Sequence, residues 1–128
     1  MGNVLKKRIV IVEDERDILE LLNMILTRAG YEVYLCDNGR NAMDLIKTTR
    51  PHLVLLDVML PGFDGKAIAA AMAANDDLSA TSIIIVSALE ESEKMFIGHP
   101  QVKDFCFKPF RSSVLLEKVK KAMGDLEE

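Results

Sequence analysis

The sequence contains no tryptophan, and only two cysteines and four prolines occur among its 128 residues. So few cysteines exclude a disulfide framework. Because Cys36 and Cys106 each lie in apolar sequence, we expect two reduced core thiols rather than a zinc site. No apolar run approaches the roughly 20 residues of a membrane-spanning helix, and acidic residues soon follow the basic start, unlike in a signal peptide. The sequence therefore predicts a cytoplasmic protein that does not enter a membrane.

An excess of positive charge is also absent, because 16 Lys and Arg are set against 20 Asp and Glu, which gives a net charge of −4. No overall field draws such a chain toward phosphate backbones, so direct nucleic-acid binding is disfavoured. The chain is 49% hydrophobic, which suffices for one compact core but not for two at this length. We expect residues 1–128 to form a single domain with no effector domain.

Short β-branched runs alternate with helical patterns along the chain. Strands are predicted at residues 8–12, 31–36, 53–56, 83–86 and 102–107. Helices are predicted between Asp14, the expected cap, and Gly30, then before Pro51, and at residues 67–74, 90–97 and 112–123. Residues 61–65 are predicted as a loop, and His52 and His99, which lie beside prolines, are expected at the surface. This alternation predicts an α/β protein with a doubly wound, five-stranded parallel sheet and five helices.

Polar residues stand directly after four of the predicted strands. Glu13 and Asp14 follow the first strand, Asp57 the third, Ser87 the fourth and Lys108 the fifth. In doubly wound sheets the ligand site lies beyond the carboxyl ends of the strands, so these side chains should meet. Crowded carboxylates repel one another unless a cation is present, and hard oxygen ligands favour Mg²⁺. Beside a hydroxyl and an ammonium, the carboxylate at the buried strand end suits attack on a phosphoryl group, which would give an acyl phosphate.

Four motifs in order along the chain carry a family resemblance. They are the acidic segment Val12–Glu15, the block Leu56–Gly65, the short segment Val86–Ala88 and the segment Phe107–Phe110. Together they resemble the receiver domain of two-component response regulators, the family that includes the bacterial chemotaxis regulator. The resemblance covers nearly the whole chain and implies a flavodoxin-like sheet with strand order 2-1-3-4-5.

The resemblance also implies a phosphoacceptor and a metal site. Asp57 would accept a phosphoryl group from a phosphohistidine on a sensor histidine kinase or phosphotransfer protein. Mg²⁺ would be held by Asp14, Asp57 and the backbone carbonyl of Met59, with Glu13 acting through water. The chain would then be a signalling switch rather than an enzyme, limited to self-phosphorylation and slow autodephosphorylation. Slow loss of the phosphoryl group is expected because Met59 and Leu89, which flank the path by which water would attack it, are both apolar.

A conformational switch is implied as well. By resemblance, Lys108 and Ser87 bind the phosphoryl oxygens, Ser87 and Phe105 move together on phosphorylation, and the Lys108–Pro109 bond is cis. The movement would alter an output face that binds a downstream target. The segment 97–104 departs from the family pattern, which predicts a short fourth helix, so the family's partner and dimer modes are not carried over to the output face.

Two other functions fit parts of the same pattern. A Mg-dependent phosphohydrolase would also use Asp57 as its nucleophile, but such enzymes place a second acid two residues on, and Met59 cannot transfer a proton. A flavin-binding module would need a phosphate loop after the first strand, where the acidic run at residues 13–15 would repel phosphate.

Overall fold

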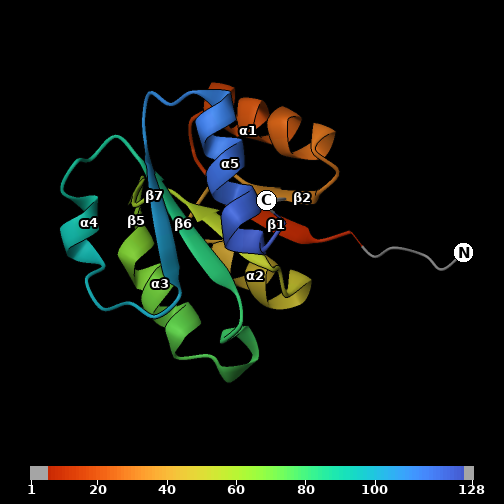
Figure 1. The fold of residues 1–128 in the computed structure, drawn as a ribbon. Coiled ribbons are helices and arrows are strands. Elements are labelled where there is room, and N and C mark those ends of the chain that lie inside the picture. Colours follow the sequence, from red (N-terminus) through yellow and green to blue (C-terminus); the bar gives the residue numbers. More distant parts are fainter. Residues whose placement is uncertain (1–5, 126–128) are drawn as a thin grey trace, which may run out of the picture.

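The computed structural model describes residues 6–125, which form a parallel sheet covered by helices on both faces (Figure 1). The strands of this sheet are β1 (Arg8–Val12), β2 (Glu32–Cys36), β3 (Leu53–Leu56), β6 (Ser82–Ser87) and β7 (Val102–Phe107). They lie in the order β2-β1-β3-β6-β7, and all neighbours pair in parallel. Because β4 and β5 belong to a separate hairpin, this is the predicted order 2-1-3-4-5, and the doubly wound fold is confirmed.

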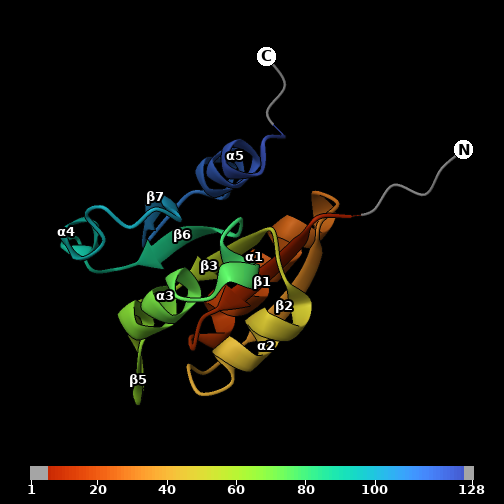
Figure 2. The same ribbon diagram turned by 90° about the horizontal axis from the view of Figure 1, so that it is seen from below.

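The helices divide between the two faces of the sheet (Figures 1 and 2). One face carries α1 (Arg16–Arg28) and α5 (Ser112–Met123). The other carries α2 (Ala42–Thr49), α3 (Gly65–Ala73) and the single turn of α4 (Ser92–Met95), and a short 3₁₀ turn, η1 (Asp76–Leu78), precedes β6. This division is the expected result of right-handed crossovers between parallel strands.

The apolar runs of the central strands fill both layers of the core. In β1, Val10 and Val12 face α2 and α3, whereas Ile9 and Ile11 face α1 and α5. All four side chains are at most 1% exposed. Strands buried on both faces need apolar residues at every position, and this is why β1, β3 and β6 read as continuous hydrophobic runs.

Several predicted element boundaries differ from the structure, besides shifts of one residue at the ends of β2 and β6. The predicted loop at residues 61–65 contains the turn and the second strand, β5 (Phe63–Asp64), of a small antiparallel hairpin whose first strand, β4 (Met59–Leu60), precedes it. The third helix begins at Gly65 rather than residue 67, because Asp64 caps it by accepting a hydrogen bond from the Lys66 amide at 2.9 Å. The fourth helix keeps only residues 92–95 of the predicted 90–97, which agrees with the expectation that it is short.

Two predictions about individual side chains are wrong. Asp14 does not cap α1, because the N-cap residue is Glu15 and its amide donates to Glu13 Oε2 at 3.1 Å. His99 is half-buried rather than a surface residue. Its Nε2 lies 3.0 Å from the Ala69 carbonyl oxygen of α3, and its Nδ1 accepts from the Gln101 amide at 3.2 Å. The turn at residues 98–101 folds the imidazole back onto α3, a contact that neighbouring prolines do not reveal in the sequence. His52 is exposed, as predicted.

Both cysteines are free and buried, as predicted. The Lys108–Pro109 peptide bond is cis, as the family resemblance implied. Within residues 6–125, every helix is too short or too polar to cross a bilayer.

Candidate functional site

The parallel register brings the ends of four strands to one rim of the sheet. Val12 pairs with Leu56 between β1 and β3, so Glu13 and Asp57 emerge next to each other. Ser87 pairs with Phe107 between β6 and β7, so the residue after β7, Lys108, emerges beside Ser87. The structure thus gathers the predicted polar residues at this rim, because strands in parallel register end together.

Lys108 is the centre of the site. Its Nζ lies 2.6 Å from Glu13 Oε1, 3.0 Å from Asp57 Oδ2 and 3.4 Å from Glu15 Oε1. The lysine side chain is only 8% exposed. Burial alone would lower the pKa of Lys108, but its hydrogen bonds and charge interactions with Glu13 and Asp57 outweigh burial and raise that pKa. The ammonium therefore remains charged and offsets part of the negative charge at the rim.

Asp57 is held in a fixed orientation at the mouth of β3. The residue is 4% exposed, its Oδ1 accepts a hydrogen bond from the Met59 amide at 2.9 Å, and its Oδ2 faces Lys108. Its own amide donates to the Val12 carbonyl oxygen at 3.0 Å. A buried carboxylate with one hydrogen-bond donor and one cation on opposite oxygens is a well-oriented nucleophile.

Glu13 is the most strongly buried acid at the rim, at 1% exposure. Burial raises its pKa to about 7, against the opposing effects of the Lys108 side chain and the Glu15 amide. Apart from its ion pair with Lys108, the Oε1 atom has no hydrogen-bond partner within the described part of the chain. A buried carboxylate oxygen that lacks a hydrogen-bond donor favours the binding of a further cation or a water molecule.

Carboxylate oxygens of Glu13, Asp14 and Asp57 all lie within 4.8 Å of one another, close enough to hold a metal ion between them. Asp14 is the most accessible of the three, so the group opens to solvent on one side. Hard carboxylate oxygens that leave room for water are the donor set that Mg²⁺ takes in proteins, and the residues present therefore fit a magnesium ion.

The two predicted switch residues lie on the neighbouring strands β6 and β7. Ser87 is 1% exposed, and its Oγ accepts from the Leu89 amide at 3.1 Å. Among the contacts of residues 6–125, Ser87 and Asp57 share no hydrogen bond. Phe105 is half-buried and packs against Phe96 with ring centroids 6.4 Å apart. The expected proximity of Ser87 to the site is present, but its hydroxyl bonds to its own turn.

Met59 lies in β4, and its side chain is 60% exposed. Its amide donates to Asp57 Oδ1, so the backbone of this residue lies beside the carboxylate, and the role of its carbonyl as a metal ligand stays a prediction. Glu15 was not among the predicted site residues, although it pairs with Lys108 and directly follows the predicted acidic pair. That adjacency was the available signal, but an acid in the first turn of a helix is also common without any function.

Comparison with known proteins places the whole sheet in one family. The family model for the response regulator receiver domain matches residues 9–120. A CheY-like response regulator receiver domain protein from Methanospirillum hungatei is 26% identical, with a TM-score of 0.84, and the match covers 94% of this chain and 96% of that one.

Two further solved structures are similar over most of their length. The receiver domain of a signal transduction histidine kinase from Syntrophus aciditrophicus is 30% identical, with a TM-score of 0.82 and coverage of 95% of this chain and 93% of that one. The response regulator protein TrrA from Thermotoga maritima, solved in complex with Mg²⁺ and BeF, is 32% identical, with a TM-score of 0.79 and coverage of 91% and 98%.

Proposed function

This chain belongs to the response regulator receiver domain family, and from that premise we propose that it is a phosphoacceptor switch whose phosphorylated residue is Asp57. Receiver domains are signalling switches rather than true enzymes and take phosphoryl groups from histidine kinases. The observation that carries the proposal is the buried Asp57 carboxylate, fixed between the Met59 amide and the Lys108 ammonium.

In the proposed reaction, an oxygen of Asp57 attacks the phosphorus of a phosphohistidine on a sensor histidine kinase or phosphotransfer protein. The P–N bond breaks, the imidazole keeps the electron pair and takes up a proton, and an acyl phosphate forms on Asp57. Lys108 Nζ lies 3.0 Å from Asp57 Oδ2 and would support the charge of the transferred group. Asp14, Asp57 and the Met59 carbonyl would hold Mg²⁺, with Glu13 acting through water. When bound, the ion neutralises charge on the phosphoryl oxygens.

The proposal includes a conformational change on phosphorylation and a slow loss of the phosphoryl group. The new phosphoryl oxygens offer strong acceptors to the Ser87 hydroxyl, which would leave the Leu89 amide, and Phe105 would turn with it toward the sheet. The changed face would then bind a downstream target. Met59 and Leu89 carry no group that can activate water, so we expect the acyl phosphate to decay slowly.

We place this switch in the cytoplasm as one receiver domain over residues 1–128, without an effector domain in these residues and without direct contact to nucleic acid or membrane. The free, buried thiols of Cys36 and Cys106 suit a reducing compartment. The net charge of −4 suits a protein partner better than a polyanion.

Intact-mass measurement after treatment with acetyl phosphate tests the proposal. We expect a gain of one phosphate in the presence of Mg²⁺, little gain in EDTA, and none in the D57N variant. The matched control is D44N, which neutralises an exposed aspartate on α2 and should gain phosphate like the native chain. Labelling that persists in D57N would refute the assignment, and continuous release of phosphate would instead support the phosphohydrolase.

A further inference from the structure

The β4–β5 hairpin connects the phosphoacceptor strand to α3 and lies directly against the acidic rim. It starts two residues after Asp57, at Met59, and in its register Met59 faces Asp64 and Leu60 faces Phe63. With only two residues in each strand, the hairpin has too few ladder hydrogen bonds to hold its own position. Contacts with other parts of the chain must therefore set where the Met59 backbone lies.

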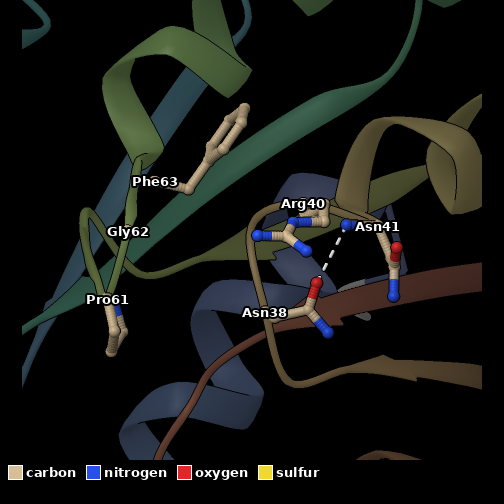
Figure 3. Close-up of a pocket in the computed structure, with 6 residues that line it drawn as sticks. All are labelled: Asn38, Arg40, Asn41, Pro61, Gly62 and Phe63. Carbon is tan, nitrogen blue, oxygen red and sulfur yellow. Dashed lines mark hydrogen bonds between the residues drawn. The ribbon is translucent and has the colours of Figure 1, made fainter.

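One such contact is made by the turn between β2 and α2. A Cβ atom added at Gly39 would lie 2.3 Å from Phe63 Cβ and 2.7 Å from Phe63 Cγ. Real Cβ atoms do not approach so closely, so the phenylalanine rests on a surface that only glycine provides. Figure 3 shows the hairpin tip at residues 61–63 opposite the turn at residues 38–41, where both segments line a cavity of about 310 Å³.

This turn is itself rigid. Asn38 Oδ1 accepts from the Asn41 amide at 2.9 Å, the bond drawn in Figure 3. The Ala42 amide donates to the Gly39 carbonyl oxygen at 3.3 Å, and Cys36 Sγ lies 2.9 Å from the Asn38 carbonyl oxygen. A side chain at position 39 would therefore displace the two-residue hairpin strand more readily than the turn.

A second glycine confines the other end of the hairpin. A Cβ added at Gly65 would lie 2.5 Å from the Asp57 carbonyl oxygen and 2.6 Å from Val58 Cα. The Gly65 amide donates to the Val58 carbonyl oxygen at 3.3 Å. Residues 58–65 thus form a loop that is fixed at its base by Gly65 and packs against Gly39 through Phe63. A displacement of Phe63 would therefore also displace the paired strand that contains Met59.

We infer that Gly39 and Phe63 are positioning residues for the metal site, because their close contact sets the β4–β5 hairpin so that the Met59 backbone bonds to Asp57 and would be in place to bind the ion. The inference rests on the proposed function in that it concerns the same magnesium site. Groups that orient metal ligands from outside typically change metal affinity by about 10- to 100-fold when they are altered.

A double-mutant cycle tests the contact, with Mg²⁺ affinity measured by calorimetry on purified G39A, F63G and G39A/F63G proteins. We expect G39A alone to weaken Mg²⁺ binding by about tenfold. Adding G39A to F63G should cause no further loss, because F63G removes the three atoms that lie nearest to the new methyl group. Equal losses from G39A in both backgrounds, or unchanged affinity in a folded G39A protein, would overturn the inference.

A metal-free measurement separates this inference from the proposed function. The Met59 amide, which donates to Asp57 Oδ1, should exchange its proton faster in G39A than in the native chain, with no further increase on adding G39A to F63G.

Y31F is the control, since it removes a hydrogen bond to Asp125 at the opposite end of the sheet. Y31F should leave both Met59 exchange and Mg²⁺ affinity unchanged, and a change in either would show that general loosening accounts for the G39A effect. If Asp57 takes up no phosphate while the cycle behaves as expected, the proposed function fails and the positioning role stands.

Discussion

Glu13 is the residue at the rim whose charge depends most on the fold. Burial raises the pKa of this carboxyl group to about 7, so near neutral pH part of the protein carries a proton there. Cations bind the carboxylate form, and a proton on Glu13 therefore competes with Mg²⁺. We expect the apparent Mg²⁺ affinity to rise with pH up to about 7 and to level off above it, as calorimetry at pH 6, 7 and 8 would measure.

Glu13→Gln supplies the comparison, because it keeps the shape of the side chain and removes the titrating group. The variant should bind Mg²⁺ more weakly at pH 8 and show little change in affinity between pH 6 and pH 8. A native chain whose affinity is the same at all three values would show that Glu13 does not govern binding.

At the scale of elements, Gln101 joins the segment before β6 to the start of β7. Its Nε2 donates to the carbonyl oxygens of Leu78 at 2.6 Å and Thr81 at 3.1 Å, and the residue is 5% exposed. Gln101→Ala would leave two carbonyl groups without this donor. We expect a loss of about 2 kcal/mol in the free energy of unfolding, measured by urea denaturation.

The control for this prediction lies two residues further on. Lys103 is exposed, and its Nζ donates only to the Pro100 carbonyl oxygen within the described residues. Lys103→Ala should change the free energy of unfolding by less than about 0.5 kcal/mol. If both variants unfold at the same urea concentration, Gln101 does not carry the connection between these strands.

The order of elements and the rim residues could be predicted from the sequence because both follow from local patterns. Asp57 directly follows the four buried residues of β3. Parallel strands bring the residues that follow them to the same edge of the sheet, independently of the loop conformations. Lys108 likewise directly follows the last strand, β7. These residues of the proposed chemistry can therefore be located from the sequence, because each one directly follows a predicted strand.

Contacts made by loops could not be predicted in the same way. The Phe63 side chain meets Gly39 only because two turns from different crossovers fold toward each other. His99 reaches the Ala69 carbonyl oxygen across 30 positions, and Glu15 reaches Lys108 across 93. Such pairings depend on tertiary geometry rather than on periodicity, so the hairpin and the half-buried His99 could not be predicted.

At the scale of the whole molecule, one carboxylate joins both ends of the described chain. Asp125, which follows α5, accepts from Lys7 Nζ at 2.6 Å and from the Tyr31 hydroxyl at 2.9 Å, while Lys7 also donates to the Met123 carbonyl oxygen at 2.6 Å. The start of β1, the start of β2 and the end of α5 are thereby connected. This cluster lies at the opposite end of the sheet from Asp57, so its contribution to stability can be changed without altering the acidic rim.

The pH dependence of stability follows from the same cluster. Burial alone would raise the pKa of Asp125, but the bonds from Lys7 and Tyr31 outweigh it and hold the pKa below the ordinary 3.8. A carboxyl group whose pKa is lower in the folded state stabilises the protein above its unfolded pKa, and that contribution is lost as the pH falls toward the folded value.

We therefore expect Asp125→Asn to lower the free energy of unfolding by about 1 kcal/mol at pH 7 in urea denaturation, and the difference from the native chain to shrink as the pH falls below about 4. Asp77→Asn, which removes an exposed partner of Arg50, should unfold like the native chain at pH 7. A difference for Asp125→Asn that stays constant down to pH 3 would mean that the charge of Asp125 does not hold the two chain ends together.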